Sequence, residues 1–140
     1  MSKASPIALA LHGGAGARRG RDYSQAEALL EALCSEGKAA LEAGDASIDV
    51  VEAMVAAMED SGLFVAGRGA APNRAGYVEL DASIMRGALA CEAGDARRAG
   101  AVAAVAHLRN PVRAARAVMD QTPHVLLAGR GAENFCRAHG

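Results

Sequence analysis

Residues 7–17 read IALALHGGAGA, an apolar run of strand length that ends directly in a glycine-rich turn. Such a continuous apolar run is typical of a strand covered on both faces, so we expect a buried strand over residues 7–11. The turn HGGAG at residues 12–16 has three glycines, more than an ordinary turn needs. Glycine lets another group approach the backbone closely, so this turn is the first candidate for a functional site.

The composition is that of a globular protein. A chain of 140 residues suits a single domain, which we place over residues 1–140. Hydrophobic residues make up 51 % and charged residues 22 %. The net charge of −1 indicates no basic surface that would bind nucleic acid or an anionic membrane. The apolar run at residues 7–11 is too short to span a bilayer. We therefore expect neither nucleic acid nor membrane as a partner.

The three cysteines are Cys34, Cys91 and Cys136, and their spacing fits no metal site. An odd number of cysteines, without a recognisable signal peptide, indicates free thiols in a reducing compartment. We accordingly predict a cytoplasmic protein.

Hydrophobic periodicity predicts an α/β chain in the order β-α-α-loop-β-β-β-α-β-α. Helices are expected over residues 24–43, 48–60, 111–121 and 131–138, and further strands over residues 77–85, 89–92, 99–108 and 124–128. Ser24-Gln25-Ala26-Glu27 has the pattern of a capping box, and Ser47 and Asn110 are the expected caps of the next two helices. The apolar stripe expected on the second helix consists of Ile48, Val51, Val55 and Met58.

The loop over residues 61–76 reads SGLFVAGRGAAPNRAG and is rich in glycine. Leu63, Phe64 and Val65 lie in its middle. Apolar residues at that position indicate a loop packed against other parts of the protein.

Local motifs identify no catalytic group. The stretch GAGARRG at residues 14–20 fails the dinucleotide-binding spacing, and a phosphate-binding loop is absent. A glycine-rich turn after a strand could form an oxyanion hole, but the chain has no G-x-S-x-G nucleophile. Thr122 precedes Pro123, where a turn role is expected. The histidines, which we interpret as structural, are His12, His107, His124 and His139.

Glu79 and Asp81 lie two residues apart in an expected strand and so share a face. A catalytic carboxylate pair has this pattern. An exposed polar face, or carboxylates that bond neighbouring backbone, have it too, and the sequence leaves these alternatives open.

Four stretches in the same order resemble plant-type L-asparaginases/isoaspartyl peptidases, which are N-terminal-nucleophile hydrolases. These stretches are HGGAGA at 12–17, SIDVVEAMVAAMEDSGLFVAGRGA at 47–70, VELDASIMRG at 78–87 and AGAVAAVAHLRNPVRAARAVMDQTPHVLLAGRGAENF at 99–135. The resemblance implies a four-layer αββα sandwich completed by a separate β chain. It also implies a precursor that cleaves itself before a threonine, which becomes the nucleophile at the start of the β chain. This chain then corresponds to the α subunit and carries no catalytic residue.

The resemblance also implies which residues support the site. His12, Gly13 and Gly14 are expected to lie near the threonine of the β chain and to leave room for it. A structural sodium ion is implied in the loop, and no organic cofactor. Its ligands by resemblance are the backbone carbonyls of Met58, Glu59, Ser61, Phe64, Ala66 and Arg68.

Three positions depart from the family pattern. Val65 stands where relatives usually have an asparagine that reaches toward the active site, and valine offers no side-chain hydrogen bond there. Gly62 replaces a usual proline, and Arg86 a usual aspartate.

The function implied is the α subunit of an enzyme that hydrolyses L-asparagine to L-aspartate and ammonia and cleaves β-aspartyl dipeptides. The resemblance further implies a dimer of αβ heterodimers. One alternative is another N-terminal-threonine hydrolase, a glycosylasparaginase or a protease-like enzyme. A second alternative is a non-catalytic homologue that acts as a binding or scaffold protein.

Overall fold

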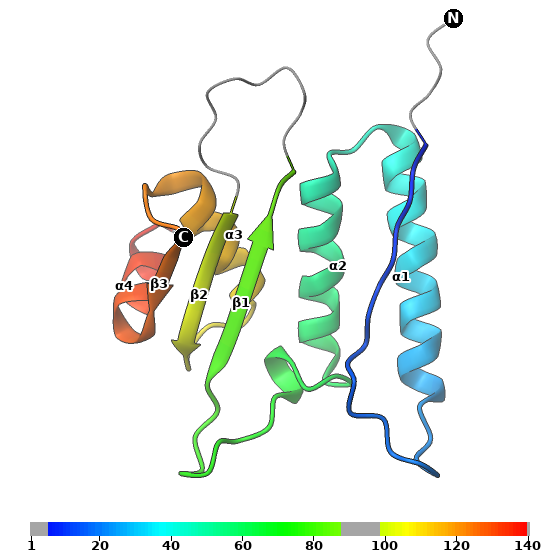
Figure 1. The fold of residues 1–140 in the computed structure, drawn as a ribbon, viewed down its shortest axis with the longest axis horizontal. Coiled ribbons are helices and arrows are strands. Elements are labelled where there is room, and N and C mark those ends of the chain that lie inside the picture. Colours follow the sequence, from blue (N-terminus) through cyan, green and yellow to red (C-terminus); the bar gives the residue numbers. More distant parts are fainter. Residues whose placement is uncertain (1–5, 88–98, 140) are drawn as a thin grey trace, which may run out of the picture.

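The computed structural model describes residues 6–87 and 99–139, which form a mixed α and β fold. Within these ranges there are four α-helices, one 3₁₀ turn and three strands (Figure 1). Helices α1 and α2 stand beside the edge of a small sheet, and α3 and α4 lie behind it. The strand expected over residues 89–92 falls outside the described residues.

Helices α1 (Ser24–Ala43) and α2 (Ser47–Ser61) match the predicted helices in position. They end at Gly44 and Gly62, which take φ angles of 100° and 72°. This left-handed conformation suits glycine and stops a helix. The predicted caps are wrong, because Ser24 and Ser47 already lie inside the first turn. The N-cap positions belong to Tyr23 and Ala46, and neither makes a side-chain capping bond.

Helix α2 is buried on two sides instead of along one stripe. Val50 and Met54 pack against Leu33 of α1, while Ile48 packs in a second cluster with residues of α3 and β1. Val51 falls between these contacts and is 40 % exposed, so the predicted stripe is wrong at this position. Helix α2 therefore packs against α1 on one side and against α3 and β1 on the other.

The strand predicted over residues 7–11 is wrong, because the segment pairs with no other strand in the described part of the chain. It runs extended beside α1 (Figure 1). Leu11 packs on the cluster formed by α1 and α2, and Leu9 touches Gly37, where a Cβ would lie 2.8 Å from Leu9 Cδ2. Leu9 and Leu11 pack on helix side chains, which offer no backbone ladder. Residues 7, 8 and 10 are exposed, so the predicted burial of this run is wrong as well.

The sheet consists of β1 (Leu80–Met85), β2 (Ala99–Val105) and β3 (Leu126–Ala128) in the order β1-β2-β3. Strands β1 and β2 are antiparallel, and β2 and β3 are parallel. Helix α3 (Pro111–Gln121) connects β2 to β3, and α4 (Gly129–His139) follows β3. The helix predicted at 111–121 is confirmed, and the one predicted at 131–138 begins two residues earlier.

All three strands are shorter than predicted because neighbouring backbone groups bond elsewhere. The N–H groups of Ala106 and His107 donate to the Glu133 carboxylate at 2.8 and 3.1 Å. Before β1, Asn73 closes a turn by accepting the N–H of Tyr77 at 3.1 Å. Residues 77–79 and 106–108 therefore leave the sheet.

One face of the sheet packs on helices and the other does not. Leu80, Ile84 and Val102 are buried in clusters with side chains of α3. The alternate positions of β1 point the other way, and Met85 is 74 % exposed. Leu126 of β3 is 55 % exposed. An antiparallel strand with one covered face shows this alternation.

Gly100 sets how closely α3 approaches β2. A Cβ at this position would overlap the Ala115 carbonyl oxygen and lie 2.5 Å from the Met119 nitrogen. The backbone of α3 thus rests directly on the strand at this point.

We predict that Gly100→Ala destabilises the complete protein by about 1–3 kcal/mol, because overpacking a tight contact forces the backbone apart. Thermal unfolding of the variant measures this loss. Gly131→Ala is the matched control, since a Cβ at Gly131 meets nothing within 4 Å. An unchanged melting temperature for Gly100→Ala would contradict the close contact.

Candidate functional site

The glycine-rich turn and the glycine-rich loop lie against each other. A Cβ at Gly13 would lie 3.0 Å from Cε1 of Phe64 and 3.2 Å from Cδ1 of Leu30. Phe64 is 7 % exposed, so its ring fills the space that a side chain at residue 13 would need. Gly14 has a φ angle of 110°, and a Cβ there would meet nothing within 4 Å. Two segments that sequence reasoning singled out separately therefore form one site.

Carbonyl oxygens gather where the loop folds back on the end of α2. A Cβ at Gly69 would overlap the Phe64 oxygen and lie 2.8 Å from the Gly62 oxygen. A Cβ at Gly67 would lie 2.7 Å from the Glu59 oxygen. The loop segment with Gly67 and Gly69 thus passes so close to these backbone oxygens that a larger residue would not fit. Oxygen ligands of this kind are those that hard cations prefer.

Hydrogen bonds brace the same loop from within. The Ser61 hydroxyl donates to the Met58 carbonyl at 2.7 Å and accepts the Leu63 N–H at 3.1 Å. The Ala66 carbonyl accepts the Gly69 N–H at 3.0 Å across the 3₁₀ turn η1 (Gly67–Gly69), which contains Arg68. A carbonyl oxygen has two lone pairs, so the bond from Gly69 leaves the Ala66 oxygen able to accept a second partner.

Of the apolar residues in the middle of the loop, only Phe64 is buried. Leu63 is 38 % exposed and Val65 is 81 % exposed, so the predicted packing of this stretch is wrong for both. His12 is exposed as well. The side chains of His12 and Val65 therefore do not contribute to the core of the described chain and are accessible to solvent.

Polar side chains join the end of α2 to the start of α3, and we call this group the α2–α3 latch. Glu59 is 3 % exposed, and its Oε1 accepts the Val112 N–H at 3.1 Å. Asp60 accepts two bonds from Arg109 at 3.0 and 3.1 Å. The Asn110 amide donates to the Ala56 carbonyl at 3.3 Å and to Asp60 at 3.2 Å. Glu59 therefore takes the capping role at α3 that the sequence assigned to Asn110.

The environment of the latch shifts the pKa values of its two carboxyl groups, Glu59 and Asp60, in opposite directions. Burial raises the pKa of Glu59, and the hydrogen bond from Val112 opposes this shift without cancelling it. The hydrogen bond from Arg109 lowers the pKa of Asp60. Glu59 is thus the carboxyl group for which burial is costly, and Asp60 is balanced by its arginine.

The carboxylates of Glu79 and Asp81 bind separate partners and form no catalytic pair. Glu79 accepts the Asn73 amide at 2.6 Å. Asp81 accepts the Ala104 N–H at 2.8 Å, where a bulge in β2 gives Ala104 a φ angle of 51°. Asp81 therefore has the alternative role of bonding neighbouring backbone.

Thr122 has the predicted turn role. Its hydroxyl donates to the Val118 carbonyl at 2.9 Å and accepts the His124 N–H at 3.1 Å. His107 lies 3.2 Å from Glu133, and Nδ1 of His139 lies 2.8 Å from the Phe135 carbonyl. Across residues 6–87 and 99–139, no cluster of three His, Cys, Asp or Glu side chains could hold a metal ion.

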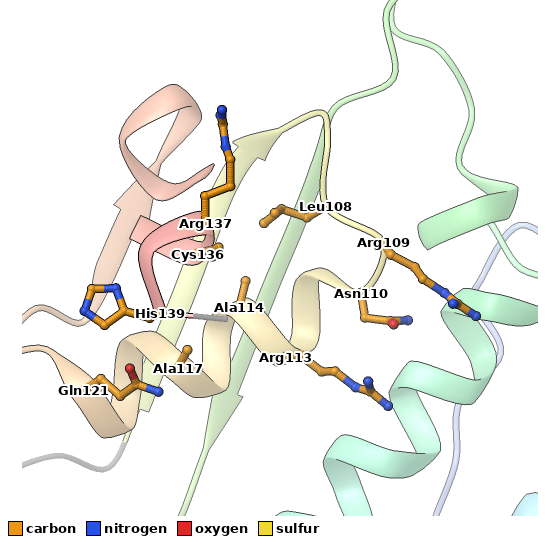
Figure 2. A pocket seen from close by; sticks show the side chains of 10 residues that line it. All are labelled: Leu108, Arg109, Asn110, Arg113, Ala114, Ala117, Gln121, Cys136, Arg137 and His139. Carbon is orange, nitrogen blue, oxygen red and sulfur yellow. The ribbon is translucent and has the colours of Figure 1, made fainter. Parts of the chain in front are cut away.

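A groove of about 470 Å³ lies between α3 and α4, and sequence reasoning missed it. Leu108, Ala114 and Ala117 form part of its lining. Figure 2 shows that Arg109 and Arg113 both extend toward α2, whereas Arg137 extends in a different direction. The three positive charges do not converge on the groove, so it has no built site for an anion.

The sequence profile of the asparaginase family matches residues 5–140. The chain belongs to this family. It is 46 % identical over 137 residues to an isoaspartyl peptidase of Escherichia coli, covering 94 % of this chain and 40 % of that protein.

Two further family members come from distant organisms. An isoaspartyl peptidase/L-asparaginase of Rattus norvegicus is 40 % identical over 136 residues, with 96 % of this chain and 38 % of that protein covered. A plant-type L-asparaginase of Pyrococcus furiosus is 41 % identical over 136 residues, with 96 % and 42 % covered. The chain thus spans about two fifths of the length of these relatives. In the described part of the asparaginase-family chain, no helix is long and apolar enough to cross a membrane.

Glu133 anchors the end of β2 to α4 and is 5 % exposed. The hydrogen bond from Ala106 N–H, together with the contacts of His107, lowers the pKa of Glu133 from its ordinary value of 4.5. Its stabilising effect is therefore complete above pH 4.5 and is lost as the pH falls through the lower folded-state pKa.

We predict that Glu133→Gln lowers the melting temperature of the complete protein at pH 7, because an amide cannot replace the charge-assisted bonds. The difference from the unchanged protein should shrink as the pH falls below about 4.5. Thermal unfolding across roughly pH 3–7 measures both effects. A difference that stays constant across this range would contradict the role of the Glu133 charge.

Proposed function

We propose that this chain is the α subunit of an enzyme that hydrolyses L-asparagine to L-aspartate and ammonia and cleaves β-aspartyl dipeptides. The family match over residues 5–140 carries this proposal, together with relatives named isoaspartyl peptidase and L-asparaginase. We place the enzyme in the cytoplasm, consistent with the free thiols of Cys34 and Cys136.

In this proposal the chemistry belongs to a threonine at the start of a β chain made from the same precursor. Its α-amine takes the hydroxyl proton, and the oxygen attacks the substrate amide carbon. The C–N bond breaks, ammonia or an amino acid leaves with the proton, and a β-aspartyl ester remains on the threonine. Water then hydrolyses this ester. The α subunit contributes the surroundings, with His12, Gly14 and Val65 accessible beside the loop.

The open face of the sheet supports a second chain as a partner. Met85, Val125 and Leu126 are exposed on or beside the sheet at 74 %, 62 % and 55 %. Exposed apolar groups on a sheet favour coverage by another layer. We propose that the β chain supplies this layer, which gives the four-layer αββα sandwich, and that two αβ heterodimers pair.

We also propose that the loop of residues 58–69 holds a structural sodium ion through backbone carbonyls. The approach of Gly67 and Gly69 to the oxygens of Glu59 and Phe64 supports this assignment. The remaining ligands in the proposal are the carbonyls of Met58, Ser61, Ala66 and Arg68. The ion would fix the loop and has no part in bond making.

The proposed activity is tested with protein made from the complete gene. We predict release of ammonia from L-asparagine and of aspartate from a β-aspartyl dipeptide, both measured by amino-acid analysis. Activity confined to a glycosylated asparagine would favour the glycosylasparaginase alternative. A folded protein that is inert toward all three substrates would favour a non-catalytic homologue and contradict the proposal.

We predict that sodium chloride raises the melting temperature of the complete protein more than choline chloride at equal ionic strength. A ligand that binds only the folded state stabilises it by about 2.7 kcal/mol at roughly a hundred times its dissociation constant. Differential scanning fluorimetry over a salt series measures the effect. Equal responses to the two salts would contradict the sodium site.

A further inference from the structure

The Glu59 side chain has a feature that its capping role leaves unexplained. Its Oε1 accepts the Val112 N–H, but its buried Oε2 has no hydrogen-bond partner among the described residues. Glu59 is 3 % exposed, so water does not freely solvate this oxygen. A buried charged oxygen without a partner costs free energy unless a positive charge lies nearby.

The backbone of the same residue faces the loop. A Cβ at Gly67 would lie 2.5 Å from Cβ, 2.8 Å from Cα and 2.7 Å from the carbonyl oxygen of Glu59. The loop therefore closes directly onto Glu59, while the side chain of Glu59 is bound to α3. A single residue connects the carbonyl cluster to the N-terminus of α3.

Neighbouring charges leave Glu59 as the carboxylate available to balance a cation. Asp60 is bound by both Arg109 and Asn110, so its charge is already compensated. Arg113 attracts Glu59 at a distance, and the nearby Asn110 amide also favours its charged form, but neither makes a hydrogen bond to Oε2 in the described structure. The partial negative charge at the C-terminal end of α2 adds to the potential around the loop.

We propose that the buried Glu59 carboxylate determines the affinity of the loop for a monovalent alkali ion. It does so by adding one fixed negative charge behind the neutral carbonyls and by holding the Glu59 carbonyl in position through its bond to Val112. This inference rests on the sodium site proposed above. One carboxylate with an unpartnered oxygen, beside neutral carbonyls, matches a single positive charge, whereas calcium sites use several carboxylates.

The test compares Glu59→Gln with Glu133→Gln in the complete protein. Both replace a buried carboxylate that accepts backbone N–H groups, but Glu133 lies on α4 and accepts the N–H groups of Ala106 and His107 at the end of β2. Glutamine keeps an oxygen that can accept the Val112 N–H and removes the charge. The readout is the sodium concentration that gives half of the sodium-specific rise in melting temperature, with choline chloride as reference.

We expect Glu59→Gln to raise this concentration about tenfold, as expected for one nearby charge in a partly screened site, and Glu133→Gln to leave it unchanged. An unchanged midpoint for Glu59→Gln, in a protein whose parent responds to sodium, would overturn the role of Glu59 and leave the sodium site standing. A parent protein that does not respond to sodium would overturn both.

A second measurement needs no variant. We expect calcium chloride to stabilise the unchanged protein less than sodium chloride at equal ionic strength, since one carboxylate cannot balance a divalent ion. Stronger stabilisation by calcium would overturn the charge-matching argument even if Glu59→Gln failed to fold.

Discussion

The contact between the end of α2 and the start of α3 is the constraint on which the rest of the chain depends. On one side, α1, α2 and the N-terminal segment share the cluster around Leu33 and Met54. On the other side, the sheet packs on α3 and α4 around Val102 and Val118. The α2–α3 latch and the apolar cluster around Ile48 join these two halves. Because the glycine-rich loop leaves α2 at this junction, the junction also positions the candidate site.

The site consists of backbone more than of reactive side chains. Gly13 lies against Phe64, and Gly67 and Gly69 lie against carbonyl oxygens of the same loop. Carboxylates that could have formed a catalytic pair hold backbone or side-chain amides instead. These contacts support the proposed role, in which the chain shapes a site whose reactive group another chain provides. Membership of the asparaginase family is consistent with this proposed role.

Local patterns predicted the elements whose signals are local. Helices α1 and α2 followed from periodic apolar residues, and α3 followed from Asn110-Pro111. The strand at 7–11 was wrong because an apolar run of that length does not reveal whether its neighbours are strands or helices. Four stretches kept in family order were a more specific signal than any single pattern.

The parts that local patterns missed depend on residues far apart in the chain. Glu59 caps a helix 53 residues away, and Glu133 binds backbone 27 residues away. No spacing rule links such pairs, because tertiary packing alone brings the two segments together.

We propose that this chain is one part of a hydrolase that cleaves its own precursor. Denaturing intact-mass analysis with N-terminal sequencing, applied to protein made from the complete gene, is the sharpest test. We expect two polypeptides, of which the second begins with threonine. A single uncut polypeptide in a preparation that hydrolyses L-asparagine would contradict it.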